Sequence, residues 1–125
     1  MRSAVFMNRT VRSFSFAARG FRYVLRGERN FQIELFVAGI VLLGMLAFDL
    51  SVLERVALIL CIVWVLTLEL VNTAVERIMD VLQPRIHPYA RIFKDVMAAA
   101  VLVSSGGALL VGLAIFVPRI FDWFS

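Results

Sequence analysis

Cysteine, histidine and charged residues are scarce in this sequence. Cys61 is the only cysteine, which excludes a framework of disulfides within the chain. Because His87 is also the only histidine, the sequence offers no set of ligands for a zinc site. Charged residues make up 18% of the chain, against about 25% in an average soluble domain. This composition argues against an ordinary soluble enzyme.

Several familiar motifs are also missing. No G-x-x-x-x-G-K-[S/T] sequence occurs, and Lys94, the only lysine, does not follow a glycine-rich loop. The motif set of the protein kinases is absent, and no Ser-His-Asp pattern has a supporting context. The N-terminal arginines are interleaved with apolar residues, and no short apolar block with a cleavage site follows them. We therefore expect no signal peptide.

Apolar residues dominate what is present. They form 62% of the chain, and the mean hydropathy is +0.90. We expect an all-α integral membrane protein with one domain over residues 1–125. Its three transmembrane helices should lie at about 31–48, 52–71 and 96–117, since each is apolar and close to the roughly 20 residues that a span needs.

The boundaries of the second and third helices follow from proline and from length. No glycine or proline interrupts the second helix between Val52 and Pro84, so it is longer than a ~30 Å hydrocarbon core requires. Its last turns should therefore project into water. We expect a loop over 83–91, which holds two prolines, and we expect Pro118 to end the third helix.

Residues 5–28 have the pattern of an amphipathic helix. Five residues with helical spacing form an apolar face: Phe14, Ala17, Ala18, Phe21 and Leu25. Five arginines lie mostly on the opposite face: Arg12, Arg19, Arg22, Arg26 and Arg29. A basic amphipathic helix next to a span is expected to lie on the membrane surface, where its arginines meet anionic lipid head groups. A soluble helix that binds a partner protein is the alternative.

The distribution of positive charge predicts the orientation. Arginine and lysine are concentrated in the N-terminal segment and in residues 77–94. The positive-inside rule places both in the cytoplasm. We therefore expect a multi-pass protein of the bacterial cytoplasmic (inner) membrane, with its N-terminus and any active site on the cytoplasmic side.

Four polar residues follow one face of the second helix. Their spacings of three, four and four place Glu69, Asn72, Glu76 and Asp80 on that face. Glu69 adjoins the apolar run, and an ionisable residue at membrane depth indicates a functional site. The alternative is the solvated end of a long helix, which suits Asp80 better than Glu69.

Other charged residues are expected at the same depth. Glu28 ends the surface helix, and Lys94 and Asp95 open the third span at its cytoplasmic end. Clustered carboxylates attract Mg²⁺, which is usually held by one or two carboxylates together with phosphate oxygens. A nearby lysine supplies a positive charge for phosphate. The pattern favours phosphoryl transfer at a membrane surface.

These motifs resemble those of the prokaryotic diacylglycerol kinase family. The similar segments are E-L-V-N-T-A-V-E-R-I-M-D at 69–80 and H-P-Y-A-R-I-F-K-D-V-M-A-A-A-V-L at 87–102, with an N-terminal pattern at Arg9, Gly20, Arg22, Glu28, Asn30 and Phe31. The resemblance implies an ATP-dependent lipid kinase that forms homotrimers, with surface helices and with active sites shared between neighbouring subunits.

Within the family, the sequence looks most like the undecaprenol kinases of Gram-positive bacteria. The E-R-N at 28–30 and the ending G-L-A-I-F-V-P-R-I at 112–120 carry this likeness. The chain departs from the Gram-negative diacylglycerol kinases at Phe16, where they have tyrosine, and at Ala98, where they have serine. The resemblance therefore favours undecaprenol as the substrate, with diacylglycerol as the alternative.

The resemblance also implies a role for each site residue. Glu69 would be the general base that accepts the proton of the lipid hydroxyl, and Asn72 would position the hydroxyl or the γ-phosphate. The other implied contacts are with Mg²⁺ and ATP: Glu28 and Glu76 as metal ligands, Lys94 on the phosphates with Asp95 orienting it, and Arg9, Asp80 and His87 around the nucleotide.

Two functions of other classes compete with a lipid kinase. One is a small proton- or cation-coupled transporter with Glu69 as its coupling site, although such sites normally lie nearer the bilayer midplane. The other is a non-catalytic scaffold that binds acidic lipids through its N-terminal arginines. Substrate movement without ATP consumption would favour the first, and absence of ATP binding would favour the second.

Overall fold

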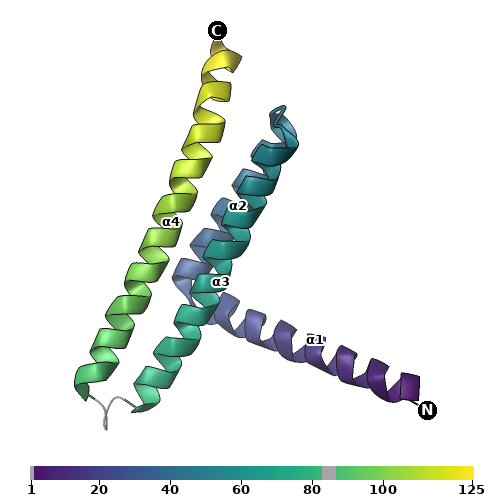
Figure 1. The fold of residues 1–125 in the computed structure, drawn as a ribbon, viewed down its shortest axis with the longest axis vertical. Helices are drawn as coiled ribbons and strands as arrows, with labels where there is room; N and C mark the ends of the chain where they lie inside the picture. Colours follow the sequence, from purple (N-terminus) through teal and green to yellow (C-terminus); the bar gives the residue numbers. More distant parts are fainter. Residues whose placement is uncertain (1, 83–86) are drawn as a thin grey trace.

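The computed structural model describes residues 2–82 and 87–125, with side chains from residues 7–82 and 88–125. Every element in these residues is a helix, and Figure 1 shows their order: α1 (Arg2–Gly27), α2 (Arg29–Ala47), α3 (Val52–Leu82) and α4 (His87–Phe124). Three of them, α2, α3 and α4, are long and apolar enough to cross a membrane. The expected all-α membrane architecture with three candidate spans is confirmed.

The three candidate spans run side by side, whereas α1 leaves them at a steep angle (Figure 1). The change of direction occurs at Glu28, whose backbone is extended between the two helices. The Gln32 side chain donates a hydrogen bond across this elbow to the carbonyl of Leu25 (2.8 Å). The fully buried ring of Phe31 packs edge-to-face on Phe21. These contacts fix the direction of α1 relative to α2.

The expected boundaries of α1 and α4 need correction. The first helix starts before residue 5, at Arg2, and ends at Gly27 rather than at residue 28. The expected loop over 83–91 is wrong for its second half, since α4 begins at His87. Pro88 is compatible with this start because the N–H that proline lacks has no partner in the first turn of a helix.

Pro118 does not end the third candidate span, because α4 continues to Phe124. The proline removes one hydrogen bond within the helix, and a long transmembrane helix tolerates this loss. Arg119 supports the same turn, since its Nη1 donates to the carbonyl of Ile115 (2.9 Å).

Close packing joins the helices at the end away from α1. Met45, Leu50, Leu58 and Ile115 form a buried cluster drawn from α2, α3, α4 and the turn before α3. Gly44 allows the close approach there, since a Cβ at this position would lie 2.9 Å from the ring of Phe116.

A polar network, here called the Arg119 clamp, closes the same end. Ser51 and Glu54 form a capping box at the start of α3: the Ser51 N–H donates to Glu54 Oε2 (2.8 Å), and the Glu54 N–H donates to Ser51 Oγ (3.2 Å). Arg119 of α4 forms an ion pair with the same Glu54 (2.7 Å) and donates to the carbonyl of Asp49 (3.4 Å).

A second ion pair joins α3 and α4 at their opposite ends, between Asp80 and Lys94. Asp80 follows Glu54 by 26 residues, and Arg119 follows Lys94 by 25. At 1.5 Å per residue both separations are about 38 Å, so the antiparallel helices are paired at both ends in one register.

The Arg119 clamp predicts a stability effect. We expect Arg119→Gln to lower the free energy of unfolding, because it breaks an ion pair between two partly exposed side chains. The double variant Arg119→Gln/Glu54→Gln should be little less stable than Arg119→Gln, since both changes break the same contact. Denaturant titration in mixed micelles measures both, with Arg55→Gln as the matched loss of charge. Additive losses would show that the pair is not energetically coupled.

Candidate functional site

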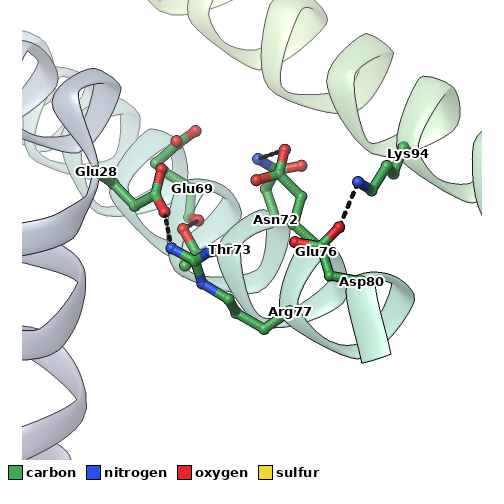
Figure 2. A network of polar contacts seen from close by, with 8 residues as sticks. All are labelled: Glu28, Glu69, Asn72, Thr73, Glu76, Arg77, Asp80 and Lys94. Atoms are coloured by element: carbon green, nitrogen blue, oxygen red, sulfur yellow. Dashed lines mark hydrogen bonds and ion pairs between the residues drawn. The ribbon is translucent and has the colours of Figure 1, made fainter. Parts of the chain in front are cut away.

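The polar face of α3 consists of two rows of side chains, each with the four-residue spacing of helical neighbours (Figure 2). Glu69, Thr73 and Arg77 form the row toward the α1–α2 elbow, where Arg77 contacts Glu28. Asn72, Glu76 and Asp80 form the row toward α4, where Asp80 contacts Lys94. The structure therefore brings together residues from α3, α4 and the elbow.

Glu69 is buried without a complete set of hydrogen bonds. Only 1% of its surface is exposed, and its Oε2 has no hydrogen-bond partner among the described residues. Thr73 is also buried, but its hydroxyl donates to the backbone carbonyl of Glu69 (3.0 Å) and leaves the carboxylate unsatisfied. Burying an unpaired polar group costs free energy. The simplest explanation for a fold that retains such a group is that the group has a function.

Asn72 presents a second unsatisfied atom beside Glu69. Its amide nitrogen donates to Glu76 Oε1 (3.4 Å), which leaves its buried Oδ1 without a partner in the described part of the chain. An amide oxygen of this kind accepts a hydrogen bond from a hydroxyl or an N–H group. Glu69 and Asn72 thus present two buried acceptors one helical turn apart.

The contacts of Lys94 differ from the expectation. Its ammonium pairs with Asp80 of α3, whereas Asp95 was expected to orient it. Consecutive residues on a helix point in different directions, so Asp95 is poorly placed to hold its neighbour. Asp80 is therefore the residue that positions Lys94 in this structure.

Glu34 is a candidate that the sequence analysis missed. It lies on α2, its buried Oε2 has no hydrogen-bond partner among the described side chains, and its charge interacts with that of Glu69. It also lines an almost wholly apolar cavity of about 450 Å³ between α2, α3 and α4, together with Val37, Leu58, Ile62 and Leu109. The available signal was a carboxylate between Ile33 and Leu35, inside the first apolar segment.

Two expected nucleotide contacts are not placed at this site. Arg9 lies on α1, 19 residues before Glu28, which corresponds to about 28 Å along the helix. The chain does not bring it to the polar face of its own α3. His87 begins α4, but its side chain lies outside what the structure describes.

The carboxylates can be compared with the needs of a divalent cation. Within residues 7–82 and 88–125, no three His, Cys, Asp or Glu side chains could hold a metal ion on their own. Glu28 and Glu76 both lie near enough to Glu69 for their charges to interact. Two carboxylates combined with phosphate oxygens are a usual Mg²⁺ environment. The residues therefore fit a cation shared with a phosphate group and not one held in an all-protein cage.

Comparison with known proteins decides the family. The family model described as "Prokaryotic diacylglycerol kinase" matches residues 15–116. The chain belongs to the prokaryotic diacylglycerol kinase family. The resemblance found in the sequence is confirmed, and the chain is a lipid kinase with membrane-spanning helices.

Two relatives within this family are similar over most of the chain. The undecaprenol kinase of Bacillus subtilis (strain 168) is 38% identical over 91% of this chain and 93% of its own length. A diacylglycerol kinase of Synechocystis (strain PCC 6803) is 36% identical over 85% of this chain and 61% of its own length. Both are named as kinases of lipids.

The buried Glu69 carboxylate predicts a conflict between stability and function. We expect Glu69→Met, which has similar length, to raise the free energy of unfolding by about 1–3 kcal/mol because it removes an unsatisfied buried group. Denaturant titration in micelles measures the change. Glu54→Met removes a carboxylate that accepts hydrogen bonds from Ser51 and Arg119, and it should lower stability instead. A Glu69→Met protein less stable than wild type would indicate that Glu69 has a structural partner.

Proposed function

We propose that this lipid kinase transfers the γ-phosphate of ATP to undecaprenol, at the cytoplasmic side of the bacterial inner membrane. The observation that supports the proposal best is the buried, unsatisfied Glu69 carboxylate. It interacts electrostatically with Glu34, which lines the apolar cavity between α2, α3 and α4. A lipid hydroxyl presented beside this cavity would meet a proton acceptor at membrane depth.

Undecaprenol is favoured over diacylglycerol by the comparisons and by two positions. The undecaprenol kinase relative matches nearly the full length of both chains. Phe16 and Ala98 stand where the Gram-negative diacylglycerol kinases carry tyrosine and serine. In this structure Phe16 lies beneath two guanidinium groups, those of Arg12 and Arg19. Diacylglycerol remains the alternative acceptor, as in the Synechocystis relative.

Glu69 begins the proposed reaction by accepting the proton of the lipid hydroxyl. The hydroxyl oxygen forms a bond to the γ-phosphorus, the bond from that phosphorus to the β–γ bridging oxygen breaks, and ADP leaves. Before transfer, the single hydroxyl proton is donated to Asn72 Oδ1 or to Glu34, which holds the hydroxyl beside Glu69 until Glu69 takes the proton. The protein contributes mainly position and charge, as expected for phosphoryl transfer.

Charged residues around Glu69 serve the nucleotide in this proposal. Glu28 and Glu76 would hold Mg²⁺, which when bound neutralises charge on the ATP phosphates. Lys94 adds a positive charge that Asp80 keeps in position. Asp95, Arg9 and His87 are proposed as further nucleotide contacts.

We also propose that the whole chain is one lipid kinase domain that acts as a homotrimer. The apolar parts of α2, α3 and α4 cross the bilayer, at about 31–48, 52–71 and 96–117, and α1 lies on the membrane surface. Because α1 extends away from its own bundle, Arg9 could reach a nucleotide only at a site on a neighbouring subunit (Figure 1). This arrangement supports the proposal that the sites are shared between subunits.

The proposal is tested by ATP-dependent phosphorylation in mixed micelles, with undecaprenol and diacylglycerol offered separately. We expect wild-type protein to label undecaprenol faster. Glu69→Gln should lower turnover by about 10³-fold or more while ATP binding and the oligomeric state are retained.

Each outcome of this experiment has a clear meaning. Faster labelling of diacylglycerol would change the substrate and keep the mechanism. Glu69→Gln at close to the wild-type rate would remove Glu69 as the base. If folded wild-type protein labels neither lipid, the proposal fails for both acceptors, and a vesicle flux assay would test transport.

Glu76 provides a separate prediction for the metal. Glu76→Gln should raise the Mg²⁺ concentration for half-maximal activity by about tenfold, because one carboxylate ligand becomes a neutral amide. A Mg²⁺ titration at saturating ATP and lipid measures the shift. Glu54→Gln, at the opposite end of α3, is the matched control. Unchanged Mg²⁺ dependence in Glu76→Gln would remove Glu76 from the metal site.

A further inference from the structure

Arg77 is a charged residue at the candidate site to which the proposed mechanism gives no role. It lies on α3 beside Glu76, in the row that continues from Glu69 through Thr73 (Figure 2). Its Nη2 contacts Glu28 Oε1 at 2.7 Å. Its guanidinium group also lies 5.8 Å from the centre of the Tyr23 ring on α1. Arg77 therefore connects α3 to both sides of the α1–α2 elbow.

Glu28 lies at the α1–α2 elbow, and its carboxylate contacts another helix instead of its own. It is the N-cap of α2, where a side chain normally accepts a hydrogen bond from the first turn, yet Glu28 makes no such bond. Its carboxylate instead turns toward α3 and meets Arg77. The elbow thus gives up a capping interaction, and Glu28 is held by a residue 49 positions later in the chain.

The contact leaves one Glu28 oxygen available. Arg77 is bonded to Oε1, and no other described side chain forms an ion pair with Glu28. The planar guanidinium fixes the direction of a carboxylate better than a flexible ammonium would. We propose that Arg77 is a positioning residue: it holds the Glu28 carboxylate so that Oε2 faces the magnesium–nucleotide complex.

This inference rests on the proposed role of Glu28, and it adds a function for the charge of Arg77. The carboxylates of Glu28 and Glu76 each lie near enough to Glu69 for their charges to interact. The positive charge of Arg77 offsets one of them before the cation binds. The row toward α4 has the same design, because Lys94 offsets Asp80 there.

The test is a double-mutant cycle on binding of Mg²⁺ with a non-hydrolysable ATP analogue, titrated into the full-length protein in micelles. We expect Arg77→Gln to weaken binding about tenfold, and Glu28→Gln at least as much. The double variant should bind no more weakly than Glu28→Gln alone, because Arg77 acts only through Glu28. Arg77→Lys should restore part of the loss, since it keeps the charge but not the planar group.

Two further measurements separate positioning from general damage. The kcat of Arg77→Gln at saturating nucleotide should stay within about twofold of wild type, while its KM for Mg²⁺–ATP rises. Arg29→Gln removes the same charge next to Glu28, at a residue without an ion pair in the described part of the chain, and should leave binding unchanged.

Two results would overturn the proposal. Losses that add in the double variant would mean that Arg77 contacts the nucleotide itself. Unchanged binding in Arg77→Gln would mean that the ion pair is a passive surface contact. The titration needs no lipid, so it tests the positioning role separately from the lipid substrate. If the losses in Arg77→Gln and Glu28→Gln are coupled but the protein phosphorylates neither lipid, the positioning role stands and only the proposed function is contradicted.

Discussion

The spacing of residues along α3 is the constraint on which the site depends. Side chains four apart form a row, and two adjacent rows face different neighbours. One row reaches the elbow through Arg77, and the other reaches α4 through Asp80. A change of one residue in the register of α3 would separate Glu69 from the elbow and Lys94 from its partner at the same time. The Arg119 clamp opposes such a slip from the other end of the helix pair.

The burial of Glu69 is the costly feature on which the proposed mechanism rests. A carboxylate in apolar surroundings costs free energy, and neither Glu69 Oε2 nor Asn72 Oδ1 recovers it within the described residues. Their positions are instead maintained by the packing and polar contacts of α2, α3 and α4. This is the expected arrangement where a binding partner completes the hydrogen bonds that the protein leaves open.

Much of the architecture could be predicted because the bilayer permits few solutions. Lipid offers no hydrogen-bond partners to the backbone, so long apolar segments must form helices there. On this basis the sequence predicted three candidate spans and a second helix starting at Val52. Proline was less reliable. Both Pro88 and Pro118 were expected outside helices, yet each lies within α4, because a first turn and a supported last turn can accommodate the missing N–H.

The sequence by itself determined the family, the membrane class and the common face of Glu69, Asn72, Glu76 and Asp80, because periodicity and motif order are local properties of the chain. Only the tertiary structure decided which side chains meet across helices. It paired Lys94 with Asp80 instead of Asp95, connected Arg77 to Glu28, and placed Glu34 near Glu69. These contacts join residues on different helices, and their existence depends on helix direction and register, which no single segment encodes.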